Sequence, residues 1–235
     1  MPVALITGSS RGLGRELALE LAGRGWSLVL DARGCEALSA TEADLRGRLG
    51  RGAQLVAVAG DVTDGAHRQA LVAAAERMGG LDLLVNNAST LGATPLPPLE
   101  RYPLEVLREA LEVNLIAPLA MAQAALPLLR RSPDPRIVNI SSDASVEAYE
   151  GWGGYGASKA ALDQLGKVLH VEEPAIRVWS IDPGDMQTQM HQDAFPGEDI
   201  SDRPLPAFSA RLIAGFLESD SRSGRYRVDD LALAR

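Results

Sequence analysis

Cysteine is nearly absent from this 235-residue sequence, which contains only Cys35. One cysteine excludes any disulfide within the chain, and that is typical of proteins from a reducing compartment. We interpret Cys35 as a small residue in a loop near the second predicted strand rather than as a reactive thiol. Aromatic residues make up only 4% of the sequence and do not alternate with basic residues, so stacking on nucleic-acid bases is not indicated.

An excess of positive charge is also missing. Lys and Arg number 23 against 31 Asp and Glu, which gives a formal net charge of −8. Because a nucleic-acid backbone is bound by clustered basic residues, no nucleic-acid partner is expected. No apolar run reaches the ~20 residues of a membrane helix, and the run Val3–Ile6 leaves no room before it for a signal peptide. We therefore expect a cytoplasmic protein with no membrane partner.

Histidine, cysteine and acidic residues show no metal-ligand spacing, so no metal site is expected. His67 and His170 lie at the start and the end of predicted helices, and we interpret both as structural or surface residues. These absences leave a protein without metal, disulfide or nucleic-acid chemistry, and the remaining signals are in its glycines and its apolar pattern.

Short apolar segments alternate with longer segments of helical period. Several of the short segments are apolar at successive positions, as in strands covered on both faces. The alternation predicts one α/β domain over residues 1–235, with a doubly wound parallel sheet of about seven strands between two layers of helices. The predicted strands are Val3–Ile6, Leu28–Leu30, Gln54–Ala59, Leu81–Val85, Ile137–Ile140 and Ile176–Ile181, and the predicted helices are Arg15–Ala22, Cys35–Leu49, His67–Met78, Pro103–Arg130 and Ala157–Leu169.

The apolar pattern weakens after Gly184. Residues 185–206 carry Pro, Gly and Asp at intervals, and they follow a strand at the sheet edge where such folds bind ligands. We predict that they form a mobile lid over a substrate. Ala207–Leu217 is predicted to be a helix and Tyr226–Val228 a short final strand.

A glycine-rich segment from Thr7 to Gly14 lies between the first predicted strand and the first predicted helix. Its glycines permit a tight turn and a close backbone approach to a pyrophosphate, and the helix start behind it offers free N–H groups. The segment predicts a dinucleotide-binding site that includes Gly8, Ser10, Arg11, Gly12, Leu13 and Gly14.

The spacing of these glycines resembles the Thr-Gly-x3-Gly-x-Gly motif of the short-chain dehydrogenase/reductase family, and further matches follow in order along the chain. They are Asp61-Val62, Asn86-Asn87-Ala88, Ser142, Tyr155 with Lys159, and Pro183-Gly184 with Thr188. The resemblance implies a Rossmann-like fold and an NAD(P)-dependent oxidoreductase that interconverts a carbonyl and an alcohol. It also implies cofactor contacts from Asp61, Val62, Asn87, Ala88, Tyr155, Lys159, Pro183, Gly184 and Thr188.

Two features depart from the family pattern. Ser89 stands where the Asn-Asn-Ala-Gly motif has its last glycine, which is expected to alter a turn without removing a chemical group. The connection 170–175, between the helix that carries Tyr155 and the sixth strand, is about two residues shorter than usual. Neither departure touches the reacting groups.

Tyr155 and Lys159 lie one turn apart on one helix face. A nearby ammonium favours a phenolate, so we expect Lys159 to lower the pKa of Tyr155 toward a range useful for acid–base catalysis. The resemblance implies that Lys159 also binds the nicotinamide ribose and that Ser142 hydrogen-bonds the substrate oxygen. The adjacent Ser141 is an alternative, but the separation from Tyr155 favours Ser142.

Asn114 is the fourth catalytic residue that the resemblance implies. Pro118, four residues later, has no N–H to donate to the Asn114 carbonyl. A water bound there would connect Lys159 to solvent, or Pro118 simply kinks the helix around the core; both readings stand.

The cofactor is expected to be NADP rather than NAD. Ala32 aligns with the position where NAD-dependent relatives carry an Asp for the ribose 2′-hydroxyl, while Arg33 and Arg11 are placed to pair with a 2′-phosphate. Asp31 would fill the acidic role if the strand register were shifted by one residue.

The expected substrate is a small carbonyl or alcohol compound. Trp152 is a candidate wall of the pocket, although packing explains it equally well. The lid would offer apolar and polar contacts, from Met186, Met190 and Phe195 and from Gln187, Gln189 and His191.

The apolar circumference of Pro103–Arg130 and of the Tyr155 helix exceeds what one sheet face covers. By resemblance these helices pair across a two-fold axis, so a homodimer or homotetramer is expected. The alternatives to catalysis are a non-catalytic dinucleotide-sensing or partner-binding protein of this fold, or a methyltransferase of similar architecture, which would lack the Tyr-x3-Lys pair.

Overall fold

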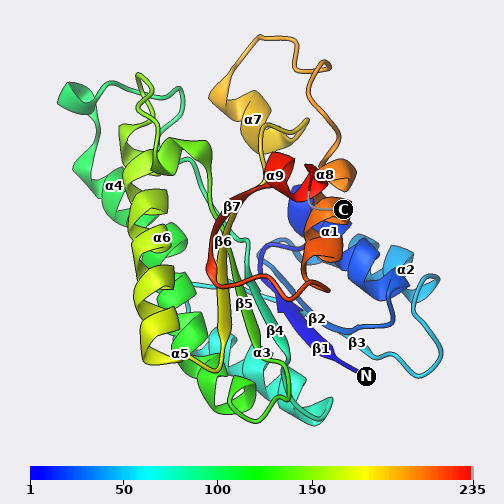
Figure 1. The fold of residues 1–235 in the computed structure, drawn as a ribbon. Helices are drawn as coiled ribbons and strands as arrows, with labels where there is room; N and C mark the ends of the chain where they lie inside the picture. The colour runs from blue at the N-terminus through cyan, green and yellow to red at the C-terminus, as the bar shows by residue number, and fades with distance from the viewer. Residues whose placement is uncertain (234–235) are drawn as a thin grey trace.

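The computed structural model describes residues 1–233. It contains one parallel sheet of seven strands in the order β3-β2-β1-β4-β5-β6-β7 (Figure 1). The order reverses between β1 and β4, and the carboxyl ends of strands at such a reversal bind ligands in open α/β sheets. The predicted doubly wound class is confirmed. The strands are β1 (Val3–Ile6), β2 (Ser27–Ala32), β3 (Leu55–Ala59), β4 (Leu83–Asn86), β5 (Arg136–Ile140), β6 (Arg177–Asp182) and β7 (Gly224–Arg227).

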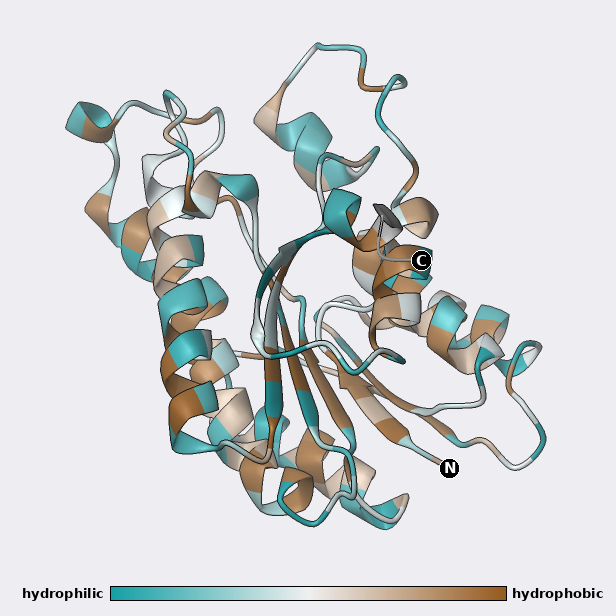
Figure 2. Ribbon diagram, viewed as in Figure 1, coloured by the Kyte–Doolittle hydropathy of each residue, from teal (hydrophilic) through white to brown (hydrophobic). Residues whose placement is uncertain are grey.

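Helices cover both faces of the sheet. One layer holds α1 (Gly12–Gly23), α2 (Cys35–Arg46) and α8 (Pro206–Phe216), and the other holds α3 (Gly65–Arg77), α5 (Ala117–Leu129) and α6 (Gly153–Glu172). Strand side chains alternate between the two cores: Leu28 and Leu30 pack on the first layer and Val29 on the second. Burial on both faces explains why the strands are apolar at successive positions, as the hydropathy colouring in Figure 2 shows.

The predicted helix Pro103–Arg130 is broken in two. It consists of α4 (Leu104–Leu111), a π-helical turn (Glu112–Ile116) and α5. In the π turn the Ala117 N–H donates to the Glu112 carbonyl, five residues back. Pro118 follows directly and has no N–H to donate to the Asn114 carbonyl. The disturbance of the helix that Pro118 predicts is therefore a π turn, which contains one extra residue.

The expectation that no apolar run reaches the length of a membrane helix was wrong for Leu104–Leu129. This segment is long and apolar enough to cross a membrane by length and composition, and 39% of its most apolar stretch is buried in the protein. Its buried side packs under the sheet through residues such as Met121 and Ala125. Its second part, α5, therefore belongs to the protein core, while apolar residues such as Leu104 and Ile116 remain exposed.

Several local predictions were wrong at their boundaries. The helix predicted to begin at Cys35 does begin there, as α2, so Cys35 is an exposed helix residue and its assignment to a loop was wrong. The helix that carries Tyr155 begins at Gly153, four residues before the predicted start. Two short helices were not predicted: α7 (Gln189–Ala194), within the segment expected to be irregular, and α9 (Val228–Leu233), which begins where the last strand was expected to continue.

Candidate active site

The backbone of the glycine-rich segment is held by close contacts with the end of β4. Gly8 has a φ of +64°, and a Cβ there would lie 2.8 Å from the Ala88 Cα. A Cβ on Gly14 would lie 2.5 Å from the Gly8 carbonyl oxygen. The side-chain amide of Asn87 donates to the carbonyls of Thr7 and Gly8, at 2.8 and 3.0 Å. Only glycine fits at these two positions, so the shape of the turn is fixed by the sequence.

The start of α1 meets the requirements of a pyrophosphate site. Arg11 occupies the N-cap position and makes no side-chain capping bond, so the first N–H groups of the helix have no side-chain acceptor there. A Cβ on Gly12 would meet only the Thr188 methyl group, at 3.7 Å. The open side of the turn therefore faces the segment after β6. Of the other predicted contacts here, Leu13 is buried in the core, and the Ser10 carbonyl accepts the Thr41 hydroxyl at 3.1 Å.

Asp61 and Arg33 lie near each other at the carboxyl ends of β3 and β2. Asp61 accepts the backbone N–H and the hydroxyl of Thr63, at 2.9 and 2.8 Å. Those hydrogen bonds, together with the charge of Arg33, hold the pKa of Asp61 below its usual value. Arg33 is exposed and Val62 is buried. An ionised carboxylate and an exposed guanidinium thus flank the position expected for the adenosine.

Asp31 lies near the end of β2, next to the glycine-rich turn. Ala32 is the last residue of β2 and pairs with Ala59, so Asp31 lies one residue inside the strand. One Asp31 carboxylate oxygen contacts the His67 Nε2 at 2.6 Å, and the other accepts the Gly8 N–H at 3.3 Å. Asp31 and His67 are both buried, at 2% and 8% exposure. His67 is therefore a structural residue beneath the glycine-rich turn and not a surface residue.

Tyr155 and Lys159 are buried side by side in the first turns of α6. Their exposed fractions are 7% and 2%. The Lys159 Nζ lies 5.5 Å from the centre of the Tyr155 ring and donates to the Ile140 carbonyl at 2.8 Å. Burial lowers the pKa of Lys159 to about 8. The expected lowering of the Tyr155 pKa was wrong for this structure: burial raises it, and that effect outweighs the hydroxyls of Ser89 and Ser142, which lower it.

Ser142, rather than Ser141, faces the phenol. The Ser142 hydroxyl accepts the N–H of Ala144 at 3.2 Å, capping the short 3₁₀ turn Asp143–Ser145, and it favours ionisation of Tyr155 by hydrogen bonding. Ser141 is 2% exposed, and its hydroxyl points to Ser145 at 3.4 Å. Of the two alternatives that the sequence left open, the geometry favours Ser142.

Asn114 lies in the π turn, and its amide connects the site to the segment after β4. Its side-chain oxygen accepts the Ser89 hydroxyl at 3.1 Å and the Thr90 N–H at 2.9 Å. Its side-chain nitrogen donates to the Thr90 carbonyl and to Ser158, at 2.8 and 3.0 Å. Ser89 was expected only to alter a turn, yet it adds a hydroxyl between Asn114 and Tyr155. The sequence signal for it was the replacement of a motif glycine by a residue with a hydrogen-bonding side chain.

An apolar cluster lies beside Tyr155. Trp152 is in edge contact with the Tyr155 ring at 5.7 Å and lies 5.9 Å from Phe195, just after α7. Leu91, Leu96 and the α7 residue Met190 complete it. The predicted wall residues Trp152, Met190 and Phe195 therefore come together, whereas Met186 packs against the main core.

Comparison with known proteins places this arrangement among nucleotide-dependent oxidoreductases. A family model described as short chain dehydrogenase matches residues 2–199. Sepiapterin reductase of Rattus norvegicus is 38% identical over 201 residues, which cover 81% of this chain and 76% of that protein. A rhamnolipids biosynthesis 3-oxoacyl-[acyl-carrier-protein] reductase of Pseudomonas aeruginosa is 36% identical over 196 residues, with 80% and 74% covered.

Solved structures agree in fold. An alcohol dehydrogenase of the archaeon Thermococcus sibiricus, complexed with 5-hydroxy-NADP, superposes with a TM-score of 0.86 at 28% identity. The superposition covers 97% of this chain and 95% of that chain.

Proposed function

The chain belongs to the short-chain dehydrogenase/reductase family, and from that membership we propose that it reduces carbonyl compounds with a nicotinamide dinucleotide, with Tyr155 as the proton donor. Family membership makes it an NAD(P)-dependent oxidoreductase. The observation that supports the assignment of Tyr155 is its burial in one cluster with Lys159 and the Ser142 hydroxyl, at the carboxyl edge of the sheet.

The bound cofactor would supply the hydride that adds to the carbonyl carbon. In the same reaction the Tyr155 hydroxyl gives its proton to the carbonyl oxygen, which becomes the alcohol oxygen. Because burial raises the pKa of Tyr155, the phenol is protonated throughout the neutral range. The Ser142 hydroxyl, which donates to the Asp143 carboxylate at 3.0 Å, would exchange that bond for one to the same substrate oxygen and stabilise its developing charge. In oxidation of an alcohol the proton moves in the opposite direction.

Lys159 keeps a positive charge close to the phenol. One N–H of its ammonium donates to the Ile140 carbonyl, and two further N–H groups remain. We propose that one of them binds the nicotinamide ribose and that the other belongs to the chain of hydrogen bonds through which Tyr155 regains a proton. Asn114 would supply the next step of that route through its backbone carbonyl, because Pro118 has no N–H to occupy it. Its side chain is fully engaged with Ser89, Thr90 and Ser158.

We propose NADP as the preferred cofactor, and the support for this lies at Asp31. Both oxygens of that carboxylate are engaged, by His67 and by the Gly8 N–H, so it is not available to bind a ribose 2′-hydroxyl. Ala32 offers no polar group, whereas the exposed Arg33 can pair with a 2′-phosphate. The solved relative complexed with 5-hydroxy-NADP agrees with this preference.

A substitution at Arg33 tests the cofactor preference. Arg33→Ala should lower kcat/KM for NADPH by roughly 10–100-fold, because a charge-assisted hydrogen bond contributes about 1.5–3 kcal/mol, and it should change the NADH value little. Arg46→Ala, on the outer side of α2 and 63% exposed, is the matched control. A wild-type preference for NADH, or equal losses with both cofactors, would contradict the assignment.

The substrate is proposed to be a carbonyl compound with an apolar or aromatic group beside the carbonyl. Trp152, Phe195 and Met190 pack together beside Tyr155, and an apolar surface there favours a ligand with an apolar body. The names of two relatives suggest sepiapterin and a 3-oxoacyl thioester as first candidates.

A screen of carbonyl compounds that follows NADPH absorbance tests the proposed function. The panel should include sepiapterin, a 3-oxoacyl thioester, aromatic ketones and aldehydes. Turnover of at least one of these is expected. NADPH binding with no turnover across the panel would favour the alternative, a non-catalytic dinucleotide-sensing protein.

A further inference from the structure

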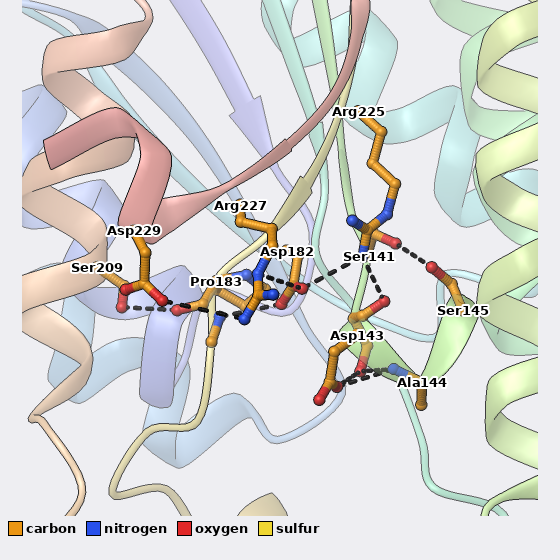
Figure 3. Close-up of polar contacts among 12 residues, drawn as sticks. Ser141, Asp143, Ala144, Ser145, Asp182, Pro183, Ser209, Arg225, Arg227 and Asp229 are labelled. Carbon is orange, nitrogen blue, oxygen red and sulfur yellow. Dashed lines mark hydrogen bonds and ion pairs between the residues drawn. The ribbon is translucent and has the colours of Figure 1, made fainter. Parts of the chain in front are cut away.

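A mostly buried arginine on the last strand contacts three parts of the candidate site. Arg225 pairs in register with Ser180 of β6, and its side chain is 18% exposed. Its Nη2 donates to the Ser142 backbone carbonyl at 2.9 Å and to the Asp182 carboxylate at 3.2 Å. Its Nε donates to the Asp163 carboxylate at 3.2 Å. Figure 3 shows the guanidinium pointing from β7 toward Asp182 and toward the segment that begins at Ser141.

Two of these contacts, with Ser142 and with Asp163, involve residues that belong to or neighbour the proposed reacting groups. The Ser142 carbonyl belongs to the residue whose hydroxyl would bind the substrate oxygen. Asp163 lies one turn after Lys159 on α6 and accepts the Ser145 hydroxyl at 2.7 Å. Arg225 therefore ties the 3₁₀ turn that begins after Ser142 to the helix that carries Lys159.

The third contact reaches the segment that faces the glycine-rich turn. The Asp182 Oδ1 accepts the Gly184 N–H at 3.1 Å, while its Oδ2 accepts Arg225. Gly184 has a φ of +70°, so the chain turns sharply there. The preceding Pro183 carbonyl accepts the buried Ser209 hydroxyl at 2.9 Å. The turn that leads to Thr188 is thus held from β7 and from α8.

Arg225 also changes the electrostatics of the candidate site, because it lies between two buried carboxylates. Asp163 and Asp182 are 4% and 3% exposed, and a buried carboxylate requires a partner. Asp163 raises the pKa of Lys159, and Asp182 together with Asp143 raises that of Tyr155. A cation between the two carboxylates opposes both effects.

We propose that Arg225 is a positioning residue that holds Ser142 and offsets the negative charge of Asp163 and Asp182 beside the reacting groups. This inference rests on the proposed function, because its readout is the rate of carbonyl reduction. It assigns a positioning role in the reaction to a residue of the final strand.

Arg225→Met tests the proposal, with Arg227→Met as the matched control. The two arginines lie two residues apart and so point to the same side of β7, but Arg227 is 58% exposed and lies 3.9 Å from Asp182. Arg225→Met should lower kcat on the order of 10–100-fold, the cost of a small misplacement of reacting groups, with little change in NADPH affinity. The basic limb of its pH–rate profile should move to higher pH, because the carboxylates lose their cation.

Two further experiments separate positioning from a loss of folding. Arg225→Lys keeps the positive charge but lacks the planar guanidinium that donates from two nitrogens. Compared with Arg225→Met, it should restore the wild-type pH profile but only part of kcat. Guanidinium, added at millimolar concentration to Arg225→Ala, should raise kcat several-fold, because a cavity of about 100 Å³ lined by Asp163, Ser180 and Arg225 gives it access. The same addition should leave the wild type and Arg227→Ala unchanged.

The possible outcomes are distinct. Kcat within twofold of wild type for Arg225→Met would overturn the proposal, as would a lower kcat with an unmoved pH profile and no rescue by Lys or guanidinium. An inactive wild type on the full carbonyl panel would instead overturn the proposed function, before any Arg225 variant is compared.

Discussion

Burial determines the protonation of the two residues at the centre of the site. Tyr155 and Lys159 are both almost completely enclosed, and burial disfavours the charged form of each group. The phenol pKa therefore rises and the ammonium pKa falls to about 8. The tyrosine is therefore protonated, as its proposed role of proton donor requires, and the lysine is the group whose lowered pKa brings its titration closer to neutral pH.

This assignment predicts how the rate of carbonyl reduction depends on pH. Lys159 is charged below a pH of about 8 and neutral above it, so kcat should be level at lower pH and should fall as the pH rises through about 8. Measurements between about pH 6 and 10, with Lys167→Met as the control on the exposed side of α6, check it. A rate that stays level to pH 10 would show that the lysine charge is not needed.

The same shift has a consequence for stability, with a definite sign. The folded pKa of Lys159 is about 8 and the ordinary value is 10.5. Between these values the unfolded chain binds more protons than the folded protein, so the contribution of this group to the free energy of unfolding rises with pH.

Single residues show what the sequence alone could predict. Tyr155, Lys159 and Ser142 could be identified because they keep a fixed spacing around a helix start and a strand end. The pairing of Asp31 with His67 could not, because 36 residues separate them and only the packing of α3 under β2 joins them. Ser89 and Arg225 act through long-range contacts with Asn114 and Ser142, which have no local sequence pattern.

Among the elements, we expect the segment after β6 to move. Its two ends are joined by a hydrogen bond from the Gln187 N–H to the Pro204 carbonyl, at 2.9 Å. Between them lies the short helix α7. Its residues Met190 and Ala194, with Phe195 directly after it, contact the Tyr155 region. Few buried contacts and a closed base are the properties of a segment with low local stability. We keep the prediction that residues 185–206 form a lid.

Hydrogen exchange checks the lid. Amides of α7 and of residues 195–204 should exchange rapidly in the free protein and slow markedly with NADPH and a carbonyl substrate, since closure excludes water. Amides of β6, which is buried on both sides, are the internal control. Equal and strong protection of α7 in both states would mean a fixed structural element.

The π turn illustrates the limit of element prediction. Pro118 indicates a disturbance of the helix around Asn114, but it does not determine whether the chain kinks or accommodates an extra residue. The choice depends on the side-chain bonds of Asn114 to Thr90 and Ser158, which anchor the turn from two other elements. The starts of α6 at Gly153 and of α7 at Gln189 were not predicted, because glycine and proline residues nearby obscure the helical period of the apolar residues.

On the scale of the whole molecule, the apolar sides of α4, the π turn and α6 remain uncovered. Leu104, Ile116, Val168 and Val171 are 60%, 48%, 41% and 77% exposed, and Figure 2 shows brown stretches along both helices. Exposed apolar side chains on elements that pack against one another favour a protein partner on this side. We keep the prediction of a homo-oligomer whose two-fold interface is formed by these helices.

Light scattering at micromolar concentration checks the oligomer. A dimer or tetramer mass is expected for the wild type. The double variant Ile116→Lys, Val168→Lys should give a monomer, because each lysine would bury a charge in the interface. Leu205→Lys, 61% exposed just before α8, should at most reduce a tetramer to a dimer. A wild-type monomer mass would contradict the prediction.

The most direct test of the central claim is the turnover of Tyr155→Phe on the best carbonyl substrate, measured together with its affinity for NADPH. The substitution removes only the hydroxyl, so binding should stay near the wild-type value while kcat falls by roughly 10²–10⁴-fold. Tyr149→Phe, whose 47%-exposed residue hydrogen-bonds Asp143 at 2.9 Å, should keep kcat within a few-fold. If Tyr155→Phe turned over at a rate close to wild type, Tyr155 would not be the proton donor, and the mechanism proposed for this protein would be wrong.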